Sequence, residues 1–358
     1  MLINVMGLDI GGANTKAAFV RAENGGVTEL KIASEYFPVW KDKGKLVNVL
    51  LELKKRLSGA APLHGVGLTM TAELSDAYQT KWEGVNHILT CTAEAFVDVP
   101  LFVLDVDATL RPIDSVKMEP LRVAAANWAA TGWMVSQLIK TCVVVDIGST
   151  STSIIPIVNG RVAAVGKTDL EKLMCGELVY TGTLRTNIAS IVRSVPLRNG
   201  SARVSSELFA QSGDVHLILG SITAKEYTSE TADGRGKTLR EAMARLARVV
   251  CADIEMLTEQ ELLEMARYIY GKQVEQVAEG LSEVYSRVKA FATCEVPVVV
   301  TGIGRNFLAR AAAEKIGADK IIDLGELLSG DVTVASPAVG VALMIASRLE
   351  GRIVKWTR

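Results

Sequence analysis

Two segments of the chain combine an aspartate, glycines and hydroxyl side chains in the same order, and this combination is typical of phosphate binding. Residues 9–16 read DIGGANTK and residues 146–153 read DIGSTSTS. Glycines let a backbone turn approach phosphate oxygens and point successive N–H groups at them, and polar side chains add donors. The candidate phosphate-binding residues are Gly11, Gly12, Asn14, Thr15 and Lys16 in the first segment and Gly148, Ser149, Thr150 and Ser151 in the second. A single such loop would be interpreted as an ordinary hairpin turn, but two copies favour phosphate binding.

Each loop starts with an aspartate that ends an apolar stretch, Asp9 in the first and Asp146 in the second. A carboxylate that faces phosphates would repel them unless a divalent cation or its water shell lay between the two. We therefore expect Mg²⁺ as a cofactor, with Asp9 and Asp146 as its candidate ligands. Asp214, which precedes the apolar run 215–219, is a further candidate metal ligand.

A third loop follows the apolar stretch 296–300 and contains Thr301, Gly302, Gly304 and Arg305. The residues after it, 307–312, have a helical pattern. A buried strand that ends in a glycine turn at a helix N-terminus suits a phosphate or the sugar and base of a nucleotide. Taken alone the signal is weak, because such turns often need glycine for packing only.

Four carboxylates are candidates for catalysis: Asp146, Glu177, Glu73 and Asp76. Glu73 and Asp76 are three residues apart and follow Thr69 and Thr71, which suggests a strand end that opens on the site. A solvated helix face is an equally good interpretation of that pair. Glu177 precedes the segment YTGTLR, whose Arg185 is a candidate phosphate ligand through a bidentate fork. A single arginine is more often a surface ion-pair partner.

The elements that must position these loops are β-hairpins. The chain continues as apolar β-type sequence after each loop, at 17–20 and at 154–158, and this argues against a P-loop or a dinucleotide-binding turn, which lead into helices. We predict equivalent hairpins at 5–20 and 143–158 that face one another across a cleft. The predicted domains are residues 1–135 and residues 136–358, the second with a helical insertion.

The composition and the apolar segments argue against nucleic-acid binding and membrane association. Lys and Arg number 39 against 40 Asp and Glu, so the basic surface of a nucleic-acid-binding protein is absent. Residues 1–12 read as a strand and a turn rather than an export signal, which predicts a cytoplasmic protein. The apolar segment 335–349 is shorter than the ~20 residues of a membrane span, so we expect a buried helix and no membrane association.

The order of the three loops resembles the actin-like ATPase superfold, with phosphate loop 1 at 9–16, phosphate loop 2 at 146–153 and the adenosine-type loop at 301–306. The resemblance implies an α/β fold of two ribonuclease-H-like domains around a central phosphate-binding cleft. Within that superfold the chain is similar to the hydantoinase/oxoprolinase-like branch linked to tetrahydromethanopterin-dependent C1 transfer. The residues that carry this similarity are GLDIGGANTK, GLTMTAELSD (67–76), AANW (125–128), VVDIGSTSTSIIPI and YTGTLRT (180–186).

The resemblance implies a transferase of methanofuran biosynthesis. Its substrates would be (5-aminomethylfuran-3-yl)methyl diphosphate and γ-glutamyltyramine, joined as an ether with release of diphosphate. The large hydantoinases are far longer than this chain, which argues against amide-ring hydrolysis. Two alternatives stay open: an ATP-dependent kinase or ATP-driven hydrolase, and a nucleotide-regulated partner protein without catalysis. An oligomer is possible.

Overall fold

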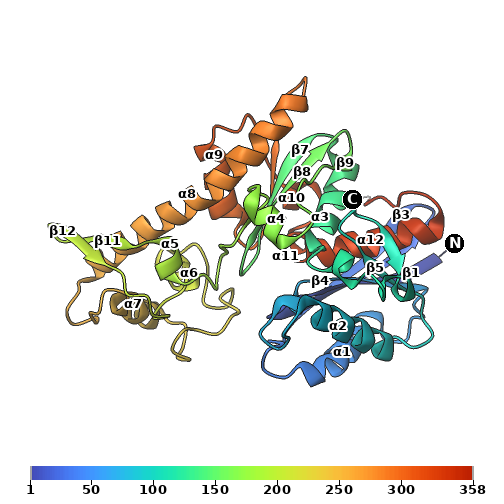
Figure 1. The fold of residues 1–358 in the computed structure, drawn as a ribbon, viewed down its shortest axis with the longest axis horizontal. Helices are drawn as coiled ribbons and strands as arrows, with labels where there is room; N and C mark the ends of the chain where they lie inside the picture. The colour runs from blue at the N-terminus through green and yellow to red at the C-terminus, as the bar shows by residue number, and fades with distance from the viewer. Residues whose placement is uncertain (1, 357–358) are drawn as a thin grey trace. The chain divides into compact units, whose positions relative to one another are not determined.

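The computed structural model describes residues 2–356 and contains two mixed sheets (Figure 1). The first has the strand order β3-β2-β1-β4-β5-β6. Its strands are β1 (Leu2–Ile10), β2 (Asn14–Glu23), β3 (Gly26–Tyr36), β4 (Gly65–Met70), β5 (Leu101–Leu104) and β6 (Leu110–Pro112). β1, β2 and β3 form an antiparallel meander, whereas β4 runs parallel to β1, and β5 runs parallel to β4.

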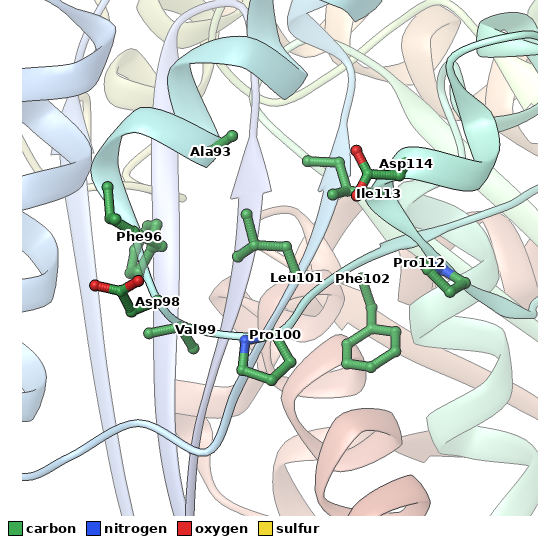
Figure 2. A pocket seen from close by; sticks show the side chains of 11 residues that line it. Ala93, Phe96, Asp98, Val99, Pro100, Leu101, Phe102, Pro112, Ile113 and Asp114 are labelled. Carbon is green, nitrogen blue, oxygen red and sulfur yellow. The ribbon is translucent and has the colours of Figure 1, made fainter.

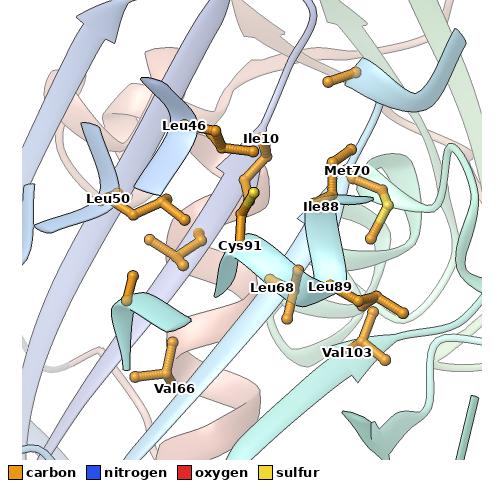
Figure 3. Close-up of a cluster of buried hydrophobic side chains, with 14 of the residues drawn as sticks. Ile10, Leu46, Leu50, Val66, Leu68, Met70, Ile88, Leu89, Cys91 and Val103 are labelled. Carbon is orange, nitrogen blue, oxygen red and sulfur yellow. The ribbon is translucent and has the colours of Figure 1, made fainter. Parts of the chain in front are cut away.

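Helices cover both faces of this first sheet. One face carries α1 (Leu46–Ser58) and α2 (Lys81–Ala95), and the apolar core between them and the sheet includes Ile10, Leu68 and Ile88 (Figure 3). The other face carries α12 (Ser336–Glu350), which packs on β1, β2 and β4 and also on α3 (Asn127–Leu138). A strand that is covered on both faces must be apolar throughout. β1 is buried from Ile3 to Ile10, and the predicted buried helix at 335–349 is confirmed as α12.

The second sheet repeats the plan of the first. Its order is β10-β8-β7-β13-β14, with β9 also paired to β8. The strands are β7 (Cys142–Ile147), β8 (Thr152–Val158), β9 (Arg161–Val162), β10 (Leu178–Val179), β13 (Val298–Gly302) and β14 (Ile321–Asp323). β13 runs parallel to β7, as β4 does to β1, and β14 runs parallel to β13. The predicted internal duplication of a strand, a turn and a second strand is therefore confirmed in the topology.

The helical insertion lies between β10 and β13. Its longest element is α8 (Glu259–Phe291), against which α6 (Ser212–Ile218) and α7 (Leu239–Arg248) bury an apolar cluster that includes Leu246, Met265 and Ile269. Short elements complete the fold: α4 (Asp169–Met174), α5 (Ile188–Ile191), the hairpin β11 (Ser194–Leu197) and β12 (Gly200–Arg203), α9 (Arg310–Lys315), α10 (Leu324–Leu327) and α11 (Gly330–Val334).

The contacts divide the chain into two compact units. The first contains residues 1–142, 155–172 and 324–358, and the second contains residues 143–154 and 173–323. This differs from a single cut after residue 135, because the C-terminal helix α12 packs on the N-terminal sheet. The mutual placement of the two hairpins across a cleft stays a prediction.

No helix within residues 2–356 has both the length and the apolar character that crossing a membrane would need.

Candidate functional site

Phosphate loop 1 is a tight turn between β1 and β2 whose carbonyl groups are held by the protein. The Gly11 amide donates to the Asn14 carbonyl at 3.0 Å and closes the turn. The carbonyl of Gly12 accepts from the Val39 amide at 2.9 Å, and that of Ala13 accepts from the Phe37 amide at 3.0 Å. The segment after β3 thus holds these carbonyls, while the Gly12 and Ala13 amides have no backbone acceptor among residues 2–356.

Phosphate loop 2 has the same construction in the second unit. The Gly148 amide donates to the Ser151 carbonyl at 3.0 Å. The Gly148 carbonyl accepts from the Thr183 amide at 2.9 Å, and the Ser149 carbonyl accepts from the amides of Leu184 and Arg185. Within the described residues, the amides of Ser149 and Thr150 have no backbone acceptor. Each loop therefore offers N–H groups to an anion while its carbonyls face the protein.

Segment 181–186 packs against loop 2 and forms hydrogen bonds with it. A Cβ added at Gly182 would lie 2.5 Å from the carbonyl carbon of Thr150, so only glycine allows this approach. The Arg185 guanidinium donates to the Thr150 hydroxyl oxygen at 3.2 Å, which places this predicted phosphate ligand at the loop. From α8, the buried Gln273 amide donates to the Gly182 carbonyl at 2.8 Å.

Asp9 is buried at the end of β1, next to loop 1. It is paired with Lys16 across β2 and with Thr69 across β4. One of its carboxylate oxygens has no hydrogen-bond partner among the described residues, and the same holds for the hydroxyls of Thr15 and Thr69. Burial raises the pKa of Asp9 to about 6, and Lys16 opposes this rise. Unpaired buried oxygens of this kind fit a ligand or an ion with its water shell.

The nucleotide-type loop packs directly on Asp146. Thr301 is the register partner of Asp146, and a Cβ at Gly302, whose φ is +86°, would lie 2.7 Å from a carboxylate oxygen of Asp146. The Gly304 amide donates to the Ile147 carbonyl at 3.1 Å. Arg305 forms an ion pair with Asp323 at 3.3 Å. The structure thus brings the third loop and loop 2 together within the second unit.

Glu73 and Asp76 differ in their surroundings. Both follow β4, and the amide of Thr71, directly after this strand, donates to the Ile10 carbonyl at 3.0 Å, so this segment lies beside loop 1. Asp76 is exposed in a turn, whereas Glu73 is 1% exposed and its carboxylate has no hydrogen-bond partner among the described residues. Burial raises the pKa of Glu73 to about 7, and Lys81, 3.9 Å away, lowers it. A buried carboxyl that titrates near neutral pH is suited to proton transfer.

Two of the predicted site carboxylates are bound by arginines. Glu177 is buried and accepts from Arg287 of α8 at 2.8 Å. Asp214 forms a fully buried ion pair with Arg245 at 2.8 Å, and its second oxygen accepts from the Gln211 amide in a capping box. The structure therefore uses Asp214 to begin α6 and to hold α7 through Arg245, and its role as a metal ligand stays a prediction.

Metal binding by a cage of protein ligands has no support. Residues 2–356 contain no group of three or more His, Cys, Asp or Glu side chains placed to hold a metal ion. Mg²⁺ usually keeps several waters and takes only one or two carboxylates. Asp9, with its unpaired oxygen, fits this second mode of binding.

A hollow of about 510 Å³ lies on the first unit, and Figure 2 shows the side chains that line it. Its lining includes Phe96, Val97, Leu101, Phe102 and Pro112 and none of the predicted site residues. Its surface is mostly apolar, so it offers few groups for a phosphorylated ligand.

The sequence did not indicate the partners of Glu73. Lys81 lies on α2. Its ammonium group donates to a carboxylate oxygen of Asp169 of α4 at 2.5 Å, and the two residues are 88 positions apart in the sequence. Ala125, whose backbone N–H lies near Glu73, has a left-handed φ of +50°. That strained conformation in a non-glycine residue marks a constrained site, and the motif AANW was its only sign in the sequence.

Comparison with known proteins adds family information. A family model described as hydantoinase/oxoprolinase matches residues 64–346. The "(4-{4-[2-(gamma-L-glutamylamino)ethyl]phenoxymethyl}furan-2-yl)methanamine synthase" of Methanocaldococcus jannaschii is 38% identical over 351 residues, which are 98% of this chain and 100% of that protein. The synthase of the same name from Methanococcus vannielii is 35% identical over 216 residues, 60% of this chain and 95% of that protein.

Among solved structures, nucleotide-free acetone carboxylase aligns with a TM-score of 0.55 and 10% identity, over 96% of this chain and 70% of that chain. At this identity the likeness concerns the fold alone. Together with the repeated sheet topology, it confirms the predicted α/β fold of the actin-like ATPase type.

Proposed function

The chain belongs to the hydantoinase/oxoprolinase family, and we propose that it is a transferase of methanofuran biosynthesis that joins (5-aminomethylfuran-3-yl)methyl diphosphate to γ-glutamyltyramine. The observation that carries this proposal is the similarity to the synthase of Methanocaldococcus jannaschii along the whole of both chains. The name of that synthase describes a phenoxymethyl furan, which is the ether that this reaction would form.

The two phosphate loops supply what a diphosphate leaving group needs. As the bond between the furan CH₂ carbon and the diphosphate oxygen breaks, its electron pair leaves with the diphosphate. N–H donors fixed in place by the protein stabilise such charge without reorganisation. Loop 1 offers the Gly12 and Ala13 amides together with Lys16, and loop 2 offers the Ser149 and Thr150 amides with Arg185.

Mg²⁺ would be held through water by Asp9 and Asp146, and it would neutralise diphosphate charge. The buried, unpaired oxygen of Asp9 supports this assignment. Without a cation, the ionised Asp9 carboxylate would repel the leaving group.

The phenol of γ-glutamyltyramine must lose its proton as its oxygen bonds to the CH₂ carbon. A free phenol has a pKa of about 10, so a base near the reacting oxygen speeds the step. Glu73 is the strongest candidate, because it is buried, lacks a hydrogen-bond partner among the described residues and lies two residues after Thr71, beside loop 1. Glu177 is disfavoured, since one of its oxygens already accepts a hydrogen bond from Arg287 at 2.8 Å.

A single reaction tests this proposal against the ATP-dependent alternative. The purified protein is incubated with Mg²⁺, both substrates and ATP, and ether, diphosphate and ADP are measured together. We expect ether and diphosphate in equal amounts, with ATP unchanged. ADP formed with a phosphorylated product, and no ether at saturating diphosphate substrate, would replace this proposal with a kinase or an ATP-driven hydrolase.

A further inference from the structure

Lys81 lies between two carboxylates that come from separate parts of the first unit. Its ammonium nitrogen is 3.9 Å from an oxygen of Glu73 and 2.5 Å from an oxygen of Asp169. The Glu73 side chain is fully buried, whereas the side chains of Lys81 and Asp169 are 27% and 22% exposed. The three residues therefore form a charged row that leads from a buried carboxylate to the surface.

The charged groups around Glu73 are few. Lys81 approaches it from α2 and Asp169 from α4, and Tyr78 lies in the turn before α2. Burial raises the pKa of Glu73, Lys81 lowers it, and Asp169 raises it. The close packing of Gly84 against the Glu73 backbone leaves no room for a larger residue on that side. Lys81 is thus the cation that most directly opposes the cost of ionising Glu73.

We infer that Lys81 is a positioning residue for the reaction proposed above, and that Asp169 holds its ammonium group beside Glu73. This inference rests on the proposed function, because it assigns Glu73 the role of base. The Lys81 ammonium stabilises ionised Glu73 before the reaction. Glu73 then takes the phenol proton, the phenol oxygen bonds to the CH₂ carbon, and the C–O bond to diphosphate breaks with its electrons leaving on diphosphate. Glu73 releases the proton to water before the next turnover.

The separation of 3.9 Å supports a positioning role over a direct hydrogen bond. An opposite charge within about 4–6 Å typically lowers the pKa of a carboxyl group by about 1–3. The ion pair with Asp169 is the shorter contact, so it fixes the lysine while neither Glu73 oxygen accepts a direct hydrogen bond from it. A purely structural lysine would hold α4 to α2 without affecting the protonation of Glu73.

The test compares the pH dependence of kcat/KM for ether formation in the wild type, Lys81→Met and Lys81→Arg. The acidic limb of this profile reports the base of the free enzyme. We expect Lys81→Met to move the limb toward higher pH by about 1 or more, and Lys81→Arg to restore it. Adding Asp169→Asn to Lys81→Met removes a negative charge near Glu73, so the limb should move part of the way back.

Lys43→Met is the matched control, because Lys43 pairs with Glu83 of α2 at 3.0 Å and does not contact Glu73. Its limb should coincide with that of the wild type. If Lys81→Met folds poorly, the double variant, which removes the Asp169 charge together with the Lys81 charge, takes its place in the comparison with wild type, where the limb should still move to higher pH. An unmoved limb in both variants overturns the inference while leaving the transferase intact.

A second readout does not depend on the reaction. Infrared titration of the carboxyl band that disappears in Glu73→Gln measures the protonation of Glu73 without substrates. A higher midpoint in Lys81→Met supports the inference even if no ether forms, in which case only the proposed function fails. An unchanged midpoint overturns it.

Discussion

Arg287 donates a hydrogen bond to Glu177 at 2.8 Å, and this contact joins α8 to the start of β10. A second guanidinium nitrogen of Arg287 donates to the Cys175 carbonyl at 2.7 Å. Glu177 and Glu73 are both buried glutamates near predicted loops, but only Glu177 has an arginine partner. The difference separates a carboxylate that is held by an arginine from one whose buried oxygens accept no side-chain hydrogen bond among the described residues.

Arg287→Met should therefore destabilise the protein. It leaves the buried Glu177 carboxylate without its cation, so we expect the free energy of unfolding to fall by about 2–3 kcal/mol, below the usual cost of breaking a buried pair because Arg287 is partly exposed. Urea denaturation measures the loss. Lys289 lies on the same helix as Arg287 and forms an exposed pair with Asp319, so Lys289→Met should cost less than about 1 kcal/mol. Equal losses in the two variants would show that the buried Glu177 pair contributes no more to the free energy of unfolding than an exposed pair does.

The sequence predicted the two loops because their signal is local. Asp9 to Lys16 form one turn whose glycines and hydroxyls are adjacent in the chain, and the strands on either side are apolar. The surroundings of the carboxylates depend on contacts between distant residues. Nothing near Asp214 in the sequence indicates Arg245, and nothing near Glu73 indicates Asp169. Candidate residues could thus be named from the sequence, but their ionisation could not.

Gly182→Ala should impair phosphate loop 2. The added Cβ would lie 2.5 Å from the carbonyl carbon of Thr150, so the loop must move and its N–H groups lose their alignment. We expect the affinity for diphosphate, measured by calorimetry, to fall about tenfold or more, since misaligned donors lose about 1.4 kcal/mol or more. Gly271→Ala in α8 is the control, because no atom lies within 4 Å of its new Cβ. Wild-type affinity in Gly182→Ala would show that this contact does not shape the loop.

Asp9→Asn should abolish ether formation and raise stability. Burial raises the pKa of folded Asp9 to about 6 from 3.8, so the folded state binds a proton more tightly than the unfolded state does. The stability of the wild type should fall as pH rises from about 4 to 6, and the cost of the buried charge is then complete at neutral pH. Asparagine avoids it, and we expect about 1–3 kcal/mol of stabilisation at pH 7. Thermal melting of the wild type and Asp9→Asn at pH 4 and pH 7 measures the pH dependence of the wild type and the stabilisation in the variant.

The companion variant Asp146→Asn should also lose turnover while keeping its fold. Asp114→Asn, in an exposed ion pair with Lys117, serves as the control for both, with unchanged turnover. Wild-type turnover in Asp9→Asn and Asp146→Asn with Mg²⁺ present would remove the proposed ion from the site.

Lys16→Ala should weaken diphosphate binding, and the effect should decrease with salt. Lys16 is paired with Asp9 across the first hairpin, where its ammonium group can approach a phosphate bound at loop 1. Salt screens such partly exposed charges, with a Debye length of about 8 Å at physiological ionic strength. Calorimetric titration with diphosphate at low and high salt gives both affinities. Lys31→Ala, on the neighbouring strand β3 and paired with Glu29, should bind diphosphate as the wild type does.

The buried His216 should make the second unit sensitive to acid. The Nε2–H of its ring donates to the Gln273 amide oxygen at 3.0 Å, and the Gln273 amide nitrogen donates to the Thr181 hydroxyl and the Gly182 carbonyl in the segment that packs on loop 2. Burial lowers the pKa of His216 to about 4 from 6.5, so the unfolded state binds a proton more readily. The stability of the wild type should then fall as pH decreases from about 6.5 to 4, by up to about 3 kcal/mol. His216→Asn, which cannot be protonated, should be less stable at pH 7 but should lose less between those two pH values. Urea denaturation of both proteins across this range decides the matter, because equal losses would mean that other groups cause the acid sensitivity.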